Sequence, residues 1–214
     1  MALLGFSCGA LIGGAFIHLL PESLEEMGQA YQAVLYYTIV GIIVFFIMEK
    51  FLYWRHCHEE KCPIHTFVYL NLIGDGVHNF IDGMIIAGSF IISYSIGIAT
   101  TFAVIFHEIP QEIGDFGVLV YGGLTKAKAL AYNFVSALTA VAGSLVTYYL
   151  ASYIQGMDTF LVPFAAGGFI YIAATDLMPE LHKRSQAKES LIQLLALLTG
   201  IGLMSTLKVL LAGV

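Results

Sequence analysis

The sequence is poor in charged residues, and in basic residues above all. Of its 214 residues, 11% are Asp, Glu, Lys or Arg, whereas 58% are hydrophobic. A soluble domain carries about 25% charged residues, so this chain has too few to cover a surface that faces water. Nine basic residues against 15 acidic ones argue against nucleic-acid binding, and three cysteines cannot form a disulfide framework. The sequence therefore predicts an integral membrane protein with a single domain over residues 1–214.

Long apolar stretches recur along the whole chain. A helix that crosses a bilayer needs about 20 mostly apolar residues, and the alternation typical of a β-barrel strand is absent. Because helices then remain the only way to satisfy the backbone in lipid, we predict an all-α membrane bundle with seven transmembrane helices. The predicted spans are 2–20, 33–53, 67–92, 95–121, 127–151, 158–181 and 190–212.

Basic residues gather in three of the six joints between these spans. Eight of the nine lie there, namely Lys50, Arg55, Lys61, Lys126, Lys128, Lys183, Arg184 and Lys188. By the positive-inside rule these joints are cytoplasmic. We therefore expect a multi-pass protein of the plasma or inner membrane, with its amino terminus in the cytoplasm and its carboxyl terminus outside. One explanation for the abrupt apolar start at Ala2 is a missing upstream helix.

Spans 67–92 and 95–121 carry polar residues that are costly inside a membrane. A carboxylate at a helix centre costs about 2.5–3.5 kcal/mol, so five of them would cost on the order of 10–15 kcal/mol. A bound divalent cation would offset this cost, which favours a metal site over a hydrogen-bond network that only packs two helices. Pro110 also lies here, and it frees the carbonyl of Phe106 because it has no N–H. The five carboxylates belong to Asp75, Asp82, Glu108, Glu112 and Asp115.

The residue types in these two spans narrow the choice of ion. His78 with Asp82, and His107 with Gln111, are i,i+4 pairs, so each pair can bind one ion from one helix face. Imidazole and carboxylate groups, with the amide oxygens of Asn79 and Gln111, suit zinc, iron(II), manganese or cobalt. The absence of cysteine from both spans argues against copper(I), and the histidines disfavour a magnesium or calcium cage.

Polar groups outside the two central spans leave alternatives open. His18 with Glu22, and Asp176 with Glu180, are i,i+4 pairs near span ends, where they either serve the two ends of a transport pathway or cap an interface. The segments that end in Glu22 and Glu180 also echo each other as Leu-Leu-Pro-Glu and Leu-Met-Pro-Glu, as in the inverted repeats of transporters. A cytoplasmic joint either receives metal or is a solvated loop. Its five candidate ligands are His56, Cys57, His58, Cys62 and His65.

Four motifs together resemble the ZIP (Zrt-, Irt-like) family of divalent metal transporters. The family's helix-four pattern HNxxD stands here at residues 78–83, and its helix-five pattern HExPHExGDF stands at residues 107–116. Its HLLPE and DLxPE patterns stand at residues 18–22 and 176–180. The chain departs from the family in lacking its first helix and in having Gln111, a neutral and weaker ligand, in place of the second histidine of helix five.

The resemblance implies eight helices, a binuclear metal centre between helices four and five, and metal movement into the cytoplasm. By motif position, the first metal site would be lined by His78, Asp82, His107 and Gln111. The second would be lined by Asn79 and Glu108. The remaining candidates for the transport pathway are His18, Glu22, Asp75, Glu112, Asp115, Asp176 and Glu180.

We therefore expect a transporter of divalent transition-metal cations, with zinc as the first choice and iron(II) or manganese as alternatives, and no enzymatic activity. The expected partners are the lipid bilayer, the metal cations and a second copy of the chain in a homodimer, with no nucleic acid. Two alternatives remain. His107-Glu108 resembles the start of the HExxH motif of an intramembrane zinc metalloprotease, although Gln111 breaks that motif. A metal-binding membrane protein without transport is the other.

Overall fold

A computed structural model describes residues 1–54, 64–153, 156–183 and 186–211. These ranges are almost entirely helical and contain no strand, which confirms the predicted all-α fold. The elements, several of which continue directly into the next, are α1 (Ala2–Gly13), η1 (Gly14–Leu19), α2 (Leu20–Met27), η2 (Gly28–Ala30), α3 (Tyr31–Trp54), α4 (Ile64–Ile92), α5 (Tyr94–Tyr121), α6 (Lys126–Ala137), α7 (Thr139–Ala151), α8 (Met157–Ile172), η3 (Ala173–Leu177), α9 (Met178–His182) and α10 (Ala187–Leu211).

The predicted spans fall within helical parts of the structure, apart from residue 212, which lies outside the described residues, and a break at Leu138. Four helical segments of the described chain are long and apolar enough to cross a membrane, namely Ala2–Lys50, Lys126–Ala151, Thr159–His182 and Ala187–Leu211. Helices α4 and α5 are not among them, because their polar motifs lower their mean hydropathy. Seven membrane crossings therefore stay a prediction.

Two of the predicted helices contain a widened turn that the apolar pattern did not predict. In η1 the N–H of Leu20 bonds the carbonyl of Ala15, and in η3 the N–H of Met178 bonds the carbonyl of Ala173. Each donor comes directly before a proline, which has no N–H for the next bond of an α-helical ladder. The five-residue spacing is that of a π-helix, which occurs mostly as single turns and frequently at functional sites.

The predicted helix over 127–151 is interrupted at Leu138, which separates α6 from α7. The Thr139 hydroxyl lies 2.6 Å from the carbonyl of Gly76 on α4 and 2.7 Å from the carbonyl of Ser136. A hydroxyl that hydrogen-bonds to backbone carbonyls competes with the helical ladder and often bends a helix. Because the bend depends on a contact with another helix, local sequence alone does not indicate it.

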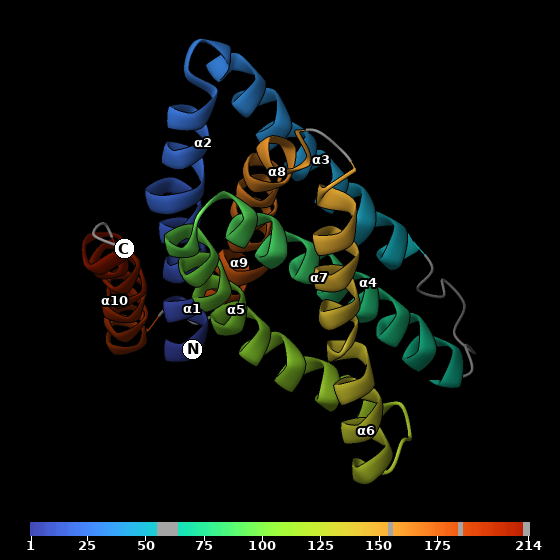
Figure 1. The fold of residues 1–214 in the computed structure, drawn as a ribbon. Helices are drawn as coiled ribbons and strands as arrows, with labels where there is room; N and C mark the ends of the chain where they lie inside the picture. The colour runs from blue at the N-terminus through green and yellow to red at the C-terminus, as the bar shows by residue number, and fades with distance from the viewer. Residues whose placement is uncertain (55–63, 154–155, 184–185, 212–214) are drawn as a thin grey trace.

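Three pairs of helices lie against each other, namely α1 with α10, α3 with α8 and α4 with α7 (Figure 1). In each pair, a glycine on one helix faces the backbone of the other. In each pair, a Cβ added to either glycine would overlap a carbonyl of the partner helix. Such close approach is how membrane helices associate without a hydrophobic driving force. The glycine pairs are Gly9 and Gly200 for α1 and α10, Gly41 and Gly167 for α3 and α8, and Gly83 and Gly143 for α4 and α7.

Helix α8 is the most enclosed of the apolar segments and forms the centre of the core. In the segment Thr159–His182, 67% of the most apolar window is buried, against 11–22% in the other three candidate spans. Phe169 is fully buried in the core that α8 forms with α1, α3, α4 and α5. Its ring lies 5.8 Å from the ring of His107 on α5, between centroids. The core thus ends directly at the polar residues of the α4–α5 pair.

Candidate metal centre

Four metal-ligating side chains converge between α4 and α5. The Nε2 atoms of His78 and His107 lie 3.4 Å apart. Asp82 Oδ2 lies 3.1 Å from the Nε2 of His107, and Glu108 Oε1 lies 3.3 Å from both imidazole Nε2 atoms. Ligands about 2.0–2.2 Å from a tetrahedral zinc ion stand about 3.3–3.6 Å from one another. The spacing of these atoms therefore fits one ion held in common.

The backbone of α5 fixes which nitrogen of His107 faces this cluster. Nδ1 lies 3.2 Å from the carbonyl oxygen of Ala103, one turn earlier. A carbonyl only accepts hydrogen bonds, so Nδ1 must carry the hydrogen. In the neutral ring the lone pair is then on Nε2, which is the atom that faces Asp82 and Glu108. Such a hydrogen bond from the remote nitrogen is typical of histidines that bind metals.

Burial makes the cluster costly without a cation. His107 and Asp82 are each 1% exposed. Both carboxylate oxygens of Asp82, and both of Glu108, are buried and lack a hydrogen-bond partner within the described part of the chain. Buried polar groups normally have such a partner. A divalent cation would occupy the lone pairs of these two carboxylates and supply the opposite charge.

Aromatic rings close two sides of the cluster. The ring of Phe45 on α3 meets the His78 imidazole edge to face, with centroids 6.0 Å apart. The ring of Phe169 meets the His107 imidazole on the other side. Because both imidazoles pack against rings of the core, the packing of the core helps to position these candidate ligands.

A second group of carboxylates adjoins the first and shares Glu108 with it. One oxygen each from Asp75, Glu108 and Glu112 lie within 4.8 Å of one another. Asn79 donates from Nδ2 to Asp75 Oδ1 at 2.9 Å, so its amide orients this carboxylate. An all-oxygen group of this kind suits a harder or more hydrated cation than the histidine cluster does.

Two further predicted residues lie on α5 but are not joined to the cluster by a described hydrogen bond. Asp115 accepts a hydrogen bond of 2.8 Å from Asn71, which links the ends of α4 and α5. Gln111 is half-buried one turn after His107. No described hydrogen bond joins Gln111 to the cluster, and its role as a ligand stays a prediction.

The predicted residues near span ends lie on other elements. His18, in η1, is 3% exposed and donates from Nε2 to the Met204 carbonyl on α10 at 2.8 Å. Glu180 pairs with Lys183 at 2.5 Å, and both side chains are exposed. Glu22 lies in α2 and is half-buried, whereas Asp176 lies in η3 and accepts from Thr175 at 3.3 Å. The loop that is predicted to be cytoplasmic lies outside the described residues, as do the side chains of its candidate ligands His56, Cys57, His58, Cys62 and His65.

Comparison with known proteins bears on this arrangement. The sequence model of the family described as "ZIP Zinc transporter" matches residues 54–208, which include all four residues of the central cluster. The chain belongs to the ZIP family. The resemblance drawn from the sequence motifs is thereby confirmed.

Several known proteins are similar to about two thirds of this chain or more. "Zinc transporter ZIP13 homolog" of Drosophila melanogaster is 31% identical over 97% of this chain and 77% of its own length. "Zinc transporter ZIP13" of Pongo abelii is 33% identical over 94% of this chain, which covers 65% of that protein. "IAA-alanine resistance protein 1" of Arabidopsis thaliana is 43% identical over 66% of this chain and 31% of its own length.

Sequence reasoning missed two contacts that this ZIP chain makes near its centre. Tyr171 on α8 donates its hydroxyl to Glu49 on α3. Glu49 lies within the predicted span 33–53. Because an acidic side chain inside a membrane is costly, its presence there could have indicated a partner on another helix. Ser7 on α1 hydrogen-bonds to the carbonyl of Phe106 at 2.5 Å. This is the carbonyl that the sequence predicts to be free, but nothing in the sequence identifies its donor.

Proposed function

We propose that this chain carries divalent transition-metal cations across a membrane and into the cytoplasm, with zinc as the preferred cargo. Family membership and relatives that are named zinc transporters support the cargo and the class of activity. The positive-inside pattern of the joints supports the cytoplasmic orientation of the basic loops. Because ZIP relatives are named as transporters, a transport role is favoured over proteolysis.

The convergence of His78, Asp82, His107 and Glu108 carries this proposal. Two imidazoles and two carboxylates, buried and 3.1–3.8 Å apart across their imidazole–carboxylate contacts, form a donor set that suits zinc. Near the middle of α4 and α5, these groups would replace the water that an ion loses on entering the membrane. The adjoining carboxylates of Asp75 and Glu112 would take the ion on its way to or from the cluster.

The direct test is zinc uptake into liposomes that contain the purified protein and an internal zinc-sensitive dye. We expect His107→Ala to reduce uptake to that of empty liposomes. Mutation of a residue that hydrogen-bonds to a metal ligand typically weakens metal binding roughly 10–100-fold, and loss of a ligand itself should weaken zinc binding by more than that. The matched control is His182→Ala, because His182 is exposed and bonds only the Met178 carbonyl of its own helix in the described contacts.

The outcomes separate the proposal from its alternatives. Uptake by His107→Ala equal to that of the parent protein would remove the cluster from the pathway. Zinc binding by the parent without any uptake would leave a metal-binding protein that does not transport. The same liposomes with iron(II) or manganese, measured in competition with zinc, would rank the cargoes.

A further inference from the structure

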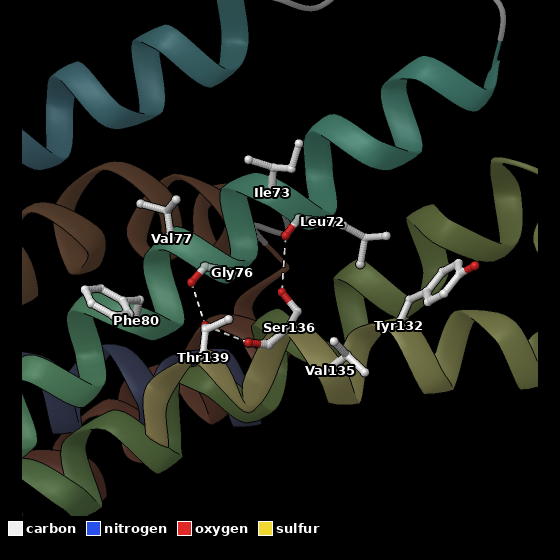
Figure 2. Close-up of a pocket in the computed structure, with 9 residues that line it drawn as sticks. All are labelled: Leu72, Ile73, Gly76, Val77, Phe80, Tyr132, Val135, Ser136 and Thr139. Atoms are coloured by element: carbon white, nitrogen blue, oxygen red, sulfur yellow. Dashed lines mark hydrogen bonds between the residues drawn. The ribbon is translucent and has the colours of Figure 1, made fainter. Parts of the chain in front are cut away.

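A groove on the outside of the bundle lies between α4 and the bend where α6 meets α7. It has a volume of about 660 Å³, which is in the range of pockets that hold small molecules. Its lining comes from α4, α6 and the start of α7, and Figure 2 shows that most of the lining side chains are apolar. Val77 and Val135 are 44% and 61% exposed, so the trough faces outward and is not part of the core.

The hydroxyl groups of Ser136 and Thr139 inside this groove are already bonded. The Ser136 hydroxyl donates to the Leu72 carbonyl at 3.2 Å, and the Thr139 hydroxyl lies 2.6 Å from the Gly76 carbonyl (Figure 2). Both hydroxyls thus bind the backbone of α4. A polar ligand or a row of waters would find few partners in this lining, whereas a hydrocarbon chain would need none.

In the described part of the chain, one end of the groove leads to an amphipathic residue and two charged residues. Tyr132 lines that end and is 40% exposed. One turn earlier on α6 stands Lys128, and Lys126 begins the helix. Both lysines are exposed, and neither forms a salt bridge with the described residues. From the lysines through Tyr132 to the apolar groove, the protein changes from cationic to amphipathic to apolar. This order matches a phospholipid from its anionic headgroup to its acyl chain.

We propose that this groove binds one acyl chain of an anionic phospholipid, with the phosphate of its headgroup at Lys126 and Lys128. The joint that contains these lysines is predicted to be cytoplasmic, and the cytoplasmic leaflet carries the anionic lipids. A protein helix suits the groove less well, because membrane helices associate through small residues. The small residue here is Gly76, and a Cβ added to it would meet Ser136 Oγ at 3.3 Å, so it faces α6 rather than the opening.

Native mass spectrometry of the purified protein would test the headgroup site. The protein would be titrated with phosphatidylglycerol and with phosphatidylcholine of the same acyl chains. Each lysine should favour the anionic lipid about fivefold, so we expect a preference of about 30-fold. The double variant Lys126→Gln/Lys128→Gln should lose this preference. The double variant Lys126→Arg/Lys128→Arg, which keeps both positive charges, should retain it. Lys188→Gln, at the start of α10, is the matched control and should change nothing.

A second pair of variants tests the groove itself. Val135→Trp would fill the trough and should reduce binding of both lipids at least tenfold, whereas Leu130→Trp, on the same helix but outside the lining, should not. Both positions are more than 60% exposed, so neither change should disturb the core. Equal binding of the two lipids by the parent would overturn the headgroup site. If Val135→Trp bound lipid as well as the parent protein does, the proposal that the groove holds an acyl chain would be wrong. If the parent protein formed a dimer and Val135→Trp did not, the groove would bind a second copy of the chain instead.

Discussion

At the scale of the residue, Gln111 offers the simplest test of the candidate metal site. It stands one turn after His107 and is the neutral member of a motif whose family pattern has histidine there. A second imidazole on this face of α5 would add a stronger ligand to the cluster. We expect Gln111→His to bind zinc more tightly than the parent protein in isothermal titration. Gln111→Asn, which keeps the amide, is the control, and unchanged zinc affinity in both variants would place position 111 outside the site.

Ser7 stabilises the bundle through its hydrogen bond to the Phe106 carbonyl. Truncation would leave that carbonyl unpaired, since position 110 has no N–H to offer it. We expect Ser7→Ala to lower the free energy of unfolding in detergent by about 1 kcal/mol. Thr199 also hydrogen-bonds to a carbonyl, that of Leu195, but within its own exposed helix face. Thr199→Ala should therefore cost less, and an equal loss in both variants would deny Ser7 a role between helices.

At the scale of the element, the glycine crossings should be sensitive to a single methyl group. A Cβ at Gly83 would overlap the Ala140 carbonyl on α7, so the α4–α7 pair would have to separate. We expect Gly83→Ala to destabilise the protein by about 1–3 kcal/mol. At Gly114 an added Cβ meets no atom within 4 Å, and alanine there should be neutral or stabilise α5 by up to about 1 kcal/mol. Unfolding in increasing denaturant would measure both, and similar stabilities would contradict the crossing.

Most of the helical architecture was predictable, because runs of about 20 apolar residues leave the backbone no other choice in lipid. The bend at Leu138 and the widened turns η1 and η3 were not predictable, because each depends on which donor forms a hydrogen bond with a particular backbone carbonyl. The convergence of His78, Asp82 and His107 followed from i,i+4 spacing and the cost of buried charge. The contact between Glu49 and Tyr171 did not follow, because an apolar sequence does not fix the rotation of each helix about its axis.

At the scale of the whole molecule, the distribution of basic residues predicts the orientation in the membrane. A cysteine introduced at Ser152, after α7, should react with a membrane-impermeant maleimide from outside the cell. A cysteine at Gln186, before α10, should react only after the membrane is permeabilised. Both sites are exposed, and Cys57 and Cys62 would be replaced by serine first. The reverse pattern of labelling would invert the proposed direction of transport.

The glycine crossings also divide the molecule mechanically. Helix α4 is pinned to α7 through Gly83 and Gly143, whereas Gly114 and Gly117 of α5 have no neighbour that an added Cβ would meet. The four candidate ligands of the cluster are divided between these two helices, with His78 and Asp82 on α4 and His107 and Glu108 on α5. A change in the distance between α4 and α5 would therefore change how many of these groups could reach one ion.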